Sequence, residues 1–246
     1  MDQAQSPIVD FHSHFVGPSL PLTTLKGLCG PQRAAWERIN ARLTDAGALL
    51  ASLEQGGVAA RIISSPPEFI EDAGGNVPQD GYRRINDAVA DLVGKHPGRL
   101  YGLASVDAYG GEPSARELER GVRQLGLRGV FMPSAKGDLL PDAEAARPTL
   151  AAAAALQIPV FLHPVADGQL FARFKRFGPL GMRLTRGTIN SARYSPSSKA
   201  VSSKNCRICA SWLQRSHWAA CCSPARSATA RNCMLGRRRP RAGTSI

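Results

Sequence analysis

Two histidines separated by one residue end the first apolar run of the chain, over residues 9–14, which read VDFHSH. Side chains alternate between the two faces of a strand, so His12 and His14 are expected to share a face, with Asp10 behind them. Two imidazoles on one side of a strand end can reach the same metal ion, and zinc prefers such nitrogen ligands. The alternative is that both histidines are hydrogen-bonded polar residues at a strand exit.

A third histidine closes another apolar run far along the chain. Residues 158–162 are wholly apolar and lead directly into His163 and Pro164. In α/β barrels the catalytic groups lie at the carboxyl ends of the strands, which is where His163 would stand. Taken alone, His163 would more often be structural. Together with His12 and His14 it predicts a divalent metal site.

Short β-rich runs that alternate with helical patterns would position these histidines. Strands are expected over residues 8–12, 58–64, 100–106, 127–132 and 158–163. Helices are expected over residues 45–55 (with Thr44 as the cap), 82–95, 115–125 and 149–156. Alternation at this spacing predicts an α/β fold with parallel strands and outer helices. The absence of a Gly-rich phosphate loop after the first strand argues against a nucleotide-binding sheet.

The run VDFHSHF, followed downstream by GLRGVFMPS and PVFLHP, resembles the amidohydrolase-related family that includes aminocarboxymuconate-semialdehyde decarboxylase and related aromatic-acid decarboxylases and hydrolases. The resemblance covers roughly residues 7–192. It implies a (β/α)8 TIM-barrel fold and a divalent metal, zinc first and manganese second, bound by His12, His14 and His163. It also implies hydrolysis or decarboxylation of a small carboxylate-bearing, aromatic or unsaturated substrate, and homo-oligomeric assembly of intact relatives.

Two features that the resemblance implies have no matching residue in this sequence. They are an acidic metal ligand from the eighth strand and a catalytic histidine from the sixth, so no catalytic residue is assigned. Lys136 follows the fourth expected strand, where it could bind a substrate carboxylate, although most such lysines are solvated. His96 is expected in a helix-terminal turn, where a cation suits the helix dipole. Cys29 is interpreted as an unremarkable free thiol.

Charge divides the chain into two parts. The sequence has 31 Lys and Arg and 19 Asp and Glu, but residues 193–246 contain 11 of the basic residues and none of the acidic ones. We therefore expect a partial barrel over residues 1–192, truncated after about five βα units, and an irregular basic tail over 193–246. The alternative function is nucleic-acid binding by this tail. A loosely zinc-knuckle-like set (Cys206, Cys209, His217 and Cys221) matches no common finger spacing.

A shifted reading frame explains the composition of the tail better. Most Ser codons begin with TC, and Cys and Trp codons begin with TG, so codons that straddle them carry T in the middle and encode apolar residues. Residues 204–212 permit the hidden text EELPNLRVV, of the kind that the family carries into its sixth strand. We therefore expect the tail to be out of frame and disordered, and this exact chain to be inactive. A barrel of five strands would also leave the fifth strand with an unpaired apolar edge.

No segment of the sequence is predicted to enter a membrane. No positively charged start is followed by an apolar core, so no signal peptide is expected. The longest apolar stretch, around residues 150–162, is interrupted by Gln157 and Pro159 and is too short to span a bilayer. The sequence predicts a cytoplasmic enzyme with a small-molecule substrate, and neither a membrane nor a nucleic acid as partner.

Overall fold

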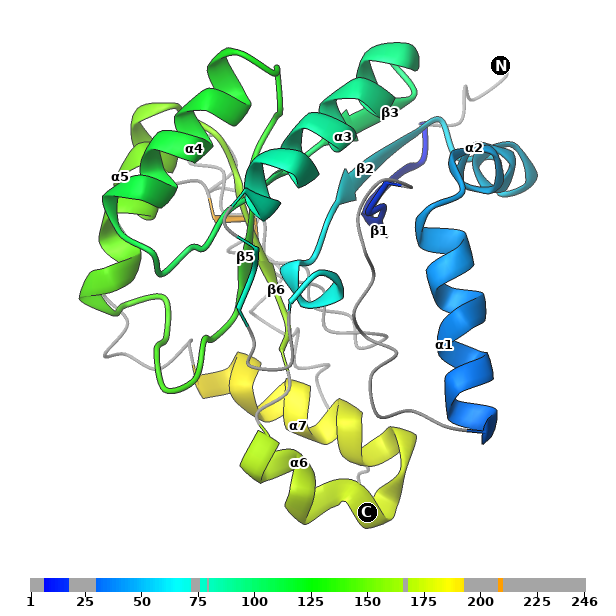
Figure 1. Ribbon diagram of the computed structural model, residues 1–246, viewed down its shortest axis with the longest axis vertical. Helices are drawn as coiled ribbons and strands as arrows, with labels where there is room; N and C mark the ends of the chain where they lie inside the picture. Colours follow the sequence, from blue (N-terminus) through cyan, green and yellow to red (C-terminus); the bar gives the residue numbers. More distant parts are fainter. Residues whose placement is uncertain are drawn as a thin grey trace, which may run out of the picture.

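Parallel strands run through the middle of the computed structural model (Figure 1), which describes residues 7–17, 30–71, 76–78, 80–165, 168–192 and 208–209. Hydrogen bonds join them in two sheets, in the orders β1-β2-β3 and β4-β5-β6-β7. Their bounds are β1 Val9–His14, β2 Ala60–Ser64, β3 Leu100–Gly102, β4 Ala104–Ser105, β5 Val130–Pro133, β6 Val160–His163 and β7 Ile208–Cys209.

The two sheets are continuous through β3 and β4, which only Leu103 separates. The N–H of Leu103 donates to the carbonyl of Ile63 in β2 (2.9 Å), and the N–H of Ala104 donates to the carbonyl of Gly129, just before β5 (2.8 Å). One extended segment therefore pairs with β2 through its first half and with β5 through its second half. This segment confirms the strand that was predicted over residues 100–106.

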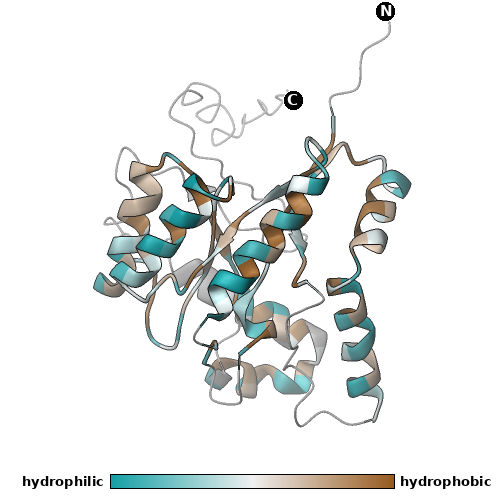
Figure 2. Ribbon diagram, turned by 45° about the horizontal axis from the view of Figure 1, so that its top comes forward, coloured by the Kyte–Doolittle hydropathy of each residue, from teal (hydrophilic) through white to brown (hydrophobic). Residues whose placement is uncertain are grey.

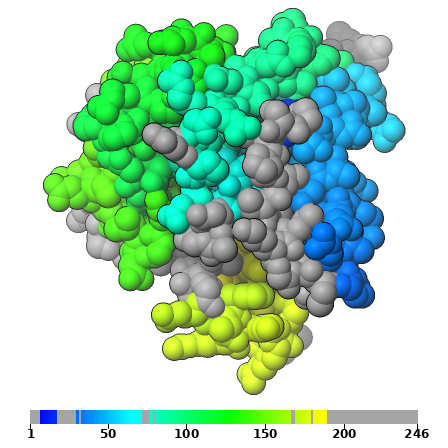
Figure 3. Space-filling view, viewed as in Figure 1, coloured from blue at the N-terminus to red at the C-terminus, as the bar shows by residue number. Residues whose placement is uncertain are grey.

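Helices alternate with the strands, and α3, α4 and α5 lie along one side of them in Figure 1. All four predicted helices are present as α2 to α5, within three residues at each end. The helices are α1 Gly30–Leu43, α2 Ala46–Gln55, α3 Gly81–Lys95, α4 Glu112–Arg123, α5 Arg147–Ala155, α6 Gly168–Phe174 and α7 Pro179–Ala192. The α6–α7 pair lies beyond the carboxyl ends of β5 and β6 and projects at one end of the molecule (Figures 1 and 3).

Asp45, and not Thr44, caps the N-terminus of α2. The Asp45 carboxylate accepts a hydrogen bond from the N–H of Ala48 (2.9 Å). The Thr44 hydroxyl instead donates to the carbonyl of Asn40 at the end of α1. The prediction that Thr44 caps this helix is therefore wrong, because its hydroxyl is engaged by the preceding helix and Asp45 is the better acceptor for a free N–H.

The strands bury a different apolar cluster on each face. Val130 and Met132 of β5 pack in the large core beneath the helices, whereas Phe131 packs with Leu103 and Phe161 on the opposite face. The helices α3 and α4 are amphipathic, with hydrophilic residues turned away from the strands (Figure 2). Close packing also explains Gly102, where a Cβ would lie 2.7 Å from Cγ1 of Val89 in α3. The inner face, free of helices, is left for the functional site.

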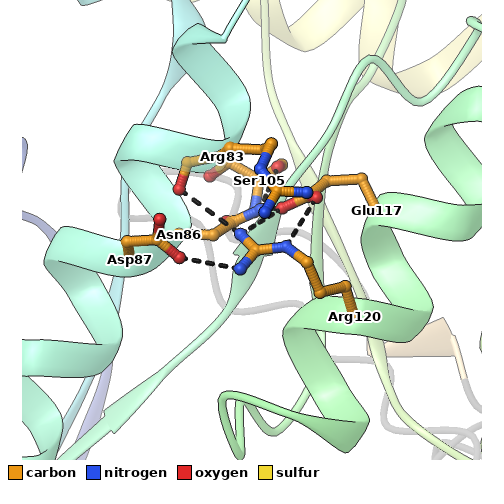
Figure 4. A network of polar contacts seen from close by, with 6 residues as sticks. All are labelled: Arg83, Asn86, Asp87, Ser105, Glu117 and Arg120. Carbon is orange, nitrogen blue, oxygen red and sulfur yellow. Dashed lines mark hydrogen bonds and ion pairs between the residues drawn. The ribbon is translucent and has the colours of Figure 1, made fainter.

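A polar network fastens α3 to β4 and α4 (Figure 4). The amide of Asn86 accepts from the N–H of Ser105 (2.8 Å) and donates to its carbonyl (3.0 Å) and to Glu117 (2.8 Å). Arg120 bridges Glu117 and Asp87, each at 2.8 Å. These hydrogen bonds satisfy the fully buried Asn86 side chain, so the network fixes where the chain leaves β4.

Beyond residue 192 the structure describes one short strand. Ile208 and Cys209 form β7, which pairs in parallel with Val160 and Phe161 of β6. The strand β6 lies within the fifth predicted strand, residues 158–163. The prediction that the edge of this strand is unpaired is wrong at Val160 and Phe161, because β7 pairs with them. The remaining part of 193–246, including Cys206, His217 and Cys221 of the possible zinc knuckle, lies outside the described residues, as does Cys29. The nucleic-acid alternative and the expected disorder of the tail rest on that same part of the chain.

Within the described residues, every helix is too short or too polar to cross a membrane.

Candidate metal centre

The three predicted metal-binding histidines come together. His12 and His14 lie in β1 and His163 ends β6, yet their ligand atoms all lie within 4.8 Å of one another. The ring centroids are 5.0 Å apart for His12 and His14, and 5.3 and 5.1 Å from these rings to His163. In the strand order, β2 to β5 separate β1 from β6. The sheet must therefore curl as a barrel does, because a flat sheet would hold these strands far apart.

Ser64 of β2 orients the ring of His14. The Ser64 hydroxyl lies 3.1 Å from Nδ1 of His14 and 3.4 Å from the carbonyl of Ser13. If its proton goes to that carbonyl, the hydroxyl accepts from Nδ1 of His14, and Nε2 keeps the lone pair that a metal ion needs. Metal-bound histidines generally hold their second ring nitrogen in this way.

Burial favours the neutral form of both β1 histidines. It lowers the pKa of His14 to about 3, with a further lowering by the neighbouring His12. Burial also lowers the pKa of His12, although the nearby Asp10 carboxylate opposes that shift. Metal ions bind the neutral imidazole, so these histidines are ready to coordinate without losing a proton. Three imidazole rings whose ligand atoms lie within 4.8 Å of one another fit a divalent metal ion.

Asp10 does not share the face of His12 and His14. Its carboxylate lies 2.9 Å from Nε of Arg61 in β2, and Arg61 in turn donates to the hydroxyl of Ser52 in α2 (2.6 Å). Strict alternation would turn Asp10 inward, but β1 has one extra residue between Asp10 and Ser13 compared with β2. This bulge places Asp10 on the helix-covered face.

A cavity of about 700 Å³ opens at the carboxyl ends of the strands. Pro164 and Val165, which directly follow His163, line it together with Lys136. The ammonium of Lys136 is half exposed and lies 2.6 Å from the carboxylate of Asp107, which also lines the cavity. Lys136 thus stands where a substrate carboxylate could reach it, but it already has an acidic partner.

Two further charged residues of the cavity were not predicted from the sequence. Burial raises the pKa of the Glu68 carboxyl to about 7, and Arg186 acts in the opposite direction. Arg186 comes from α7, and its Nε is buried without a hydrogen-bond partner. Glu68 follows β2 closely, so its place at a strand's carboxyl end was a usable signal. Arg186 had no such local signal. His96, in contrast, is the C-cap residue of α3, as expected.

Parallel strands covered by helices, with three histidines that could hold a metal ion at their carboxyl ends, define a barrel-type α/β protein. The amidohydrolase family model matches residues 9–185. The chain belongs to this family.

Curated relatives carry a more specific name. A gamma-resorcylate decarboxylase from Polaromonas sp. is 30% identical over 137 residues, which are 52% of this chain and 42% of that protein. A gamma-resorcylate decarboxylase from Rhodococcus jostii is 29% identical over 144 residues, or 52% and 43% of the two chains. The chain thus matches less than half the length of these relatives.

Solved structures share the fold at low sequence identity. A 5-carboxyvanillate decarboxylase from Sphingomonas paucimobilis superposes with a TM-score of 0.69 and 21% identity, covering 84% of this chain and 67% of that one. A dihydroxybenzoic acid decarboxylase from Polaromonas sp., with bound manganese and 2-nitroresorcinol, superposes with a TM-score of 0.66 and 22% identity. The match covers 84% of this chain and 65% of that one. These likenesses support an α/β barrel-type fold for the described residues.

Proposed function

We propose that this chain carries the metal centre and substrate cavity of a metal-dependent decarboxylase that acts on small aromatic carboxylic acids. The observation that carries the proposal is the convergence of His12, His14 and His163. Of these, His163 directly precedes Pro164 and Val165, which line the cavity, whereas His12 and His14 line a separate pocket with the rest of β1. The names of the relatives favour decarboxylation over hydrolysis. In the reaction, the bond between the ring carbon and the carboxyl group breaks, carbon dioxide leaves, and the ring carbon keeps the electron pair and takes up a proton.

The cavity has the size and lining that a substituted benzoate requires. Its volume of about 700 Å³ lies within the usual range for small-molecule sites. Val106, Pro133 and Val165 provide apolar wall, while Lys136 and Arg186 provide positive charge. We infer that these two cations attract the substrate carboxylate. Arg186 is the stronger candidate because Lys136 is paired with Asp107.

A divalent ion held by the three histidines would polarise a substrate oxygen and stabilise negative charge that develops on it. Zinc and manganese are the two candidates. Histidine nitrogens suit zinc, whereas the related dihydroxybenzoic acid decarboxylase was crystallised with manganese. Because the centre supplies three nitrogen ligands and the fourth family ligand has no match in this sequence, we expect binding of at most one ion, and weakly. Metal analysis after dialysis against each ion tests this expectation.

Because the present chain is expected to be inactive, the activity test uses the chain with its reading frame restored after about residue 192. The substrates are 2,6-dihydroxybenzoate and 5-carboxyvanillate, and carbon dioxide release is the readout. His12→Ala is the matched control, because it removes one ligand and leaves the cavity lining unchanged. Release of carbon dioxide that requires His12 supports the proposal, and hydrolysis of small esters without decarboxylation would replace it. We further propose a cytoplasmic location and homo-oligomeric assembly, the latter measurable by light scattering.

A further inference from the structure

The bulge in β1 lies at the point where the strand turns its histidines inward. Asp10 of β1 pairs with Arg61 of β2, and Ser13 pairs with Ile63, so three steps along β1 match two steps along β2. Within this interval, Phe11 and His12 both face the interior. The ring of Phe161 lies 6.3 Å from Phe11 and 5.3 Å from His12. Two successive inward side chains are what a bulge produces.

The Asp10 carboxylate closes this bulge with both oxygens. Oδ1 accepts from the backbone N–H of His12 (3.1 Å), and Oδ2 accepts from the hydroxyl of Ser13 (3.1 Å). These bonds satisfy groups within the irregular segment, where regular strand pairing is interrupted. Asp10 thereby fixes the backbone at the residue that carries a metal ligand.

Arg61 holds the carboxylate in place from the next strand. Its Nε lies 2.9 Å from Oδ2 of Asp10, and its side chain is only 12% exposed. The other end of the guanidinium donates to Ser52 (2.6 Å) and to the carbonyl of Leu49 (3.3 Å) in α2. The chain of contacts therefore runs from α2 through β2 to the backbone of His12.

The direction of the histidines depends on this irregularity. Phe11 faces inward, so in a regular strand the next residue, His12, would face outward. The extra residue shifts the alternation by one position and so turns His12 inward as well. With the bulge closed, His12 and His14 both face inward and reach His163.

We propose that Asp10, held by Arg61, is a positioning residue of the metal centre, which acts by keeping the β1 bulge closed. The consequence for metal binding rests on the proposed function, whereas the consequence for the direction of His12 does not.

The experiment compares Asp10→Ala with Asp10→Asn in the full 246-residue chain. The amide oxygen of the asparagine can still accept from the N–H of His12, but the negative charge is lost. We expect Asp10→Ala to weaken Mn²⁺ binding about 10-fold to 100-fold, the usual cost of removing a partner outside the ligand shell, and Asp10→Asn to weaken it less. Titration followed by the electron paramagnetic resonance signal of free Mn²⁺ gives both values. Equal losses in the two variants would overturn the proposal, because charge and not position would then be responsible.

A second readout needs no metal. In the unsubstituted protein with isotope-labelled histidines, nuclear Overhauser spectra are expected to show contacts between the rings of His12 and His163. These contacts should persist in Asp10→Asn and disappear in Asp10→Ala. Asn86→Ala is the control, because the α3–α4 network that it weakens includes neither the β1 bulge nor the three histidines, so these contacts and metal affinity are expected to stay unchanged. Persistence of the contacts in Asp10→Ala would refute the positioning role. If the unsubstituted chain fails to bind Mn²⁺, the proposed function fails, while the ring contacts still decide the inference.

Discussion

Ser64 contacts Nδ1 of His14 and so helps to set the orientation of that ring. Substitution of Ser64 by alanine removes this hydrogen-bond partner and frees the ring to rotate or change tautomer. We expect Ser64→Ala to weaken Mn²⁺ binding by about 10-fold, in the range found for such outer partners. Ser65→Ala is the control, since the adjacent Ser65 hydroxyl is buried and has no hydrogen-bond partner. Equal metal affinity in Ser64→Ala and the unsubstituted chain would contradict the assigned role.

Glu68 should make stability depend on pH. Burial raises the pKa of its carboxyl in the folded protein from the ordinary 4.5 to about 7, so between these values the folded state holds a proton that the unfolded state has lost. Stability should therefore fall as pH rises from about 4.5 to 7, by at most about 3 kcal/mol for such a shift. Glu68→Gln is expected to remove this fall.

Thermal melts between pH 4 and pH 8 measure the effect of Glu68. Glu119→Gln, at an exposed position of α4, is the matched control and should follow the unsubstituted chain. Parallel melting profiles for Glu68→Gln and the unsubstituted chain across this range would show that the Glu68 carboxyl is not buried as described.

Local patterns sufficed to predict the metal ligands but not the cavity charges. His12, His14 and His163 each end an apolar run, so their place at strand ends could be predicted from neighbouring residues alone. Arg186 reaches the cavity from α7, more than twenty residues after β6, and no nearby pattern marks that approach. A side chain of this kind is positioned by tertiary packing, which the sequence does not display locally.

Element boundaries were predictable wherever helix and strand patterns were strong. The weakly amphipathic α1 was not predicted, and its Ile39 is indeed 42% exposed. The helices α6 and α7 were also not predicted, although they follow His163 closely. The β1 bulge was not predicted either, because alternation in VDFHSH suggests a regular strand. The bulge is accompanied by hydrogen bonds from His12 and Ser13 to the Asp10 carboxylate, which hydrophobic periodicity cannot reveal.

The end of α5 offers a test of backbone strain. Gln157 follows the C-cap Leu156 and has a φ of 55°, in the left-handed region that glycine adopts without steric cost. We expect Gln157→Gly to raise the free energy of unfolding by about 0.5–1 kcal/mol. Gln124→Gly is the matched control, because Gln124 caps α4 with a φ of −99° and gains nothing from glycine. A lower melting temperature for Gln157→Gly would contradict the strain.

Apolar surface at two ends of the molecule should make the chain bind a hydrophobic dye. Ile8 and Val9 at the start of β1 are 59% and 47% exposed, and Leu180 and Leu184 of α7 are 55% and 43% exposed. Such surface promotes association. Dye fluorescence is expected to rise on addition of the protein, and Leu180→Ser with Leu184→Ser should reduce the rise. A monodisperse monomer that melts sharply and binds no dye would contradict this prediction.

We propose that residues after about 192 come from a shifted reading frame, and that the chain with the frame restored is the active form. A barrel site draws its groups from the ends of several strands around one rim, and residues 193–246 contain no carboxylate. We therefore expect decarboxylase activity in the frame-restored chain and negligible activity in the present one. The gene sequence read in three frames across codons 185–200 tests the origin of the tail. Equal turnover by both chains, lost in each with His12→Ala, would show that the tail is genuine.

The extra residue in β1 also determines which deletions this strand could survive. Loss of Phe11 would leave Val9, His12 and His14 in regular alternation on the inner face, with Asp10 and Ser13 on the outer one. Loss of Ser13 would instead turn one of the two histidines away from the site. A relative that lacks one residue of this first strand can therefore keep the same ligand geometry if the missing residue is the one at the position of Phe11. The geometry is lost if the missing residue is the one at the position of Ser13.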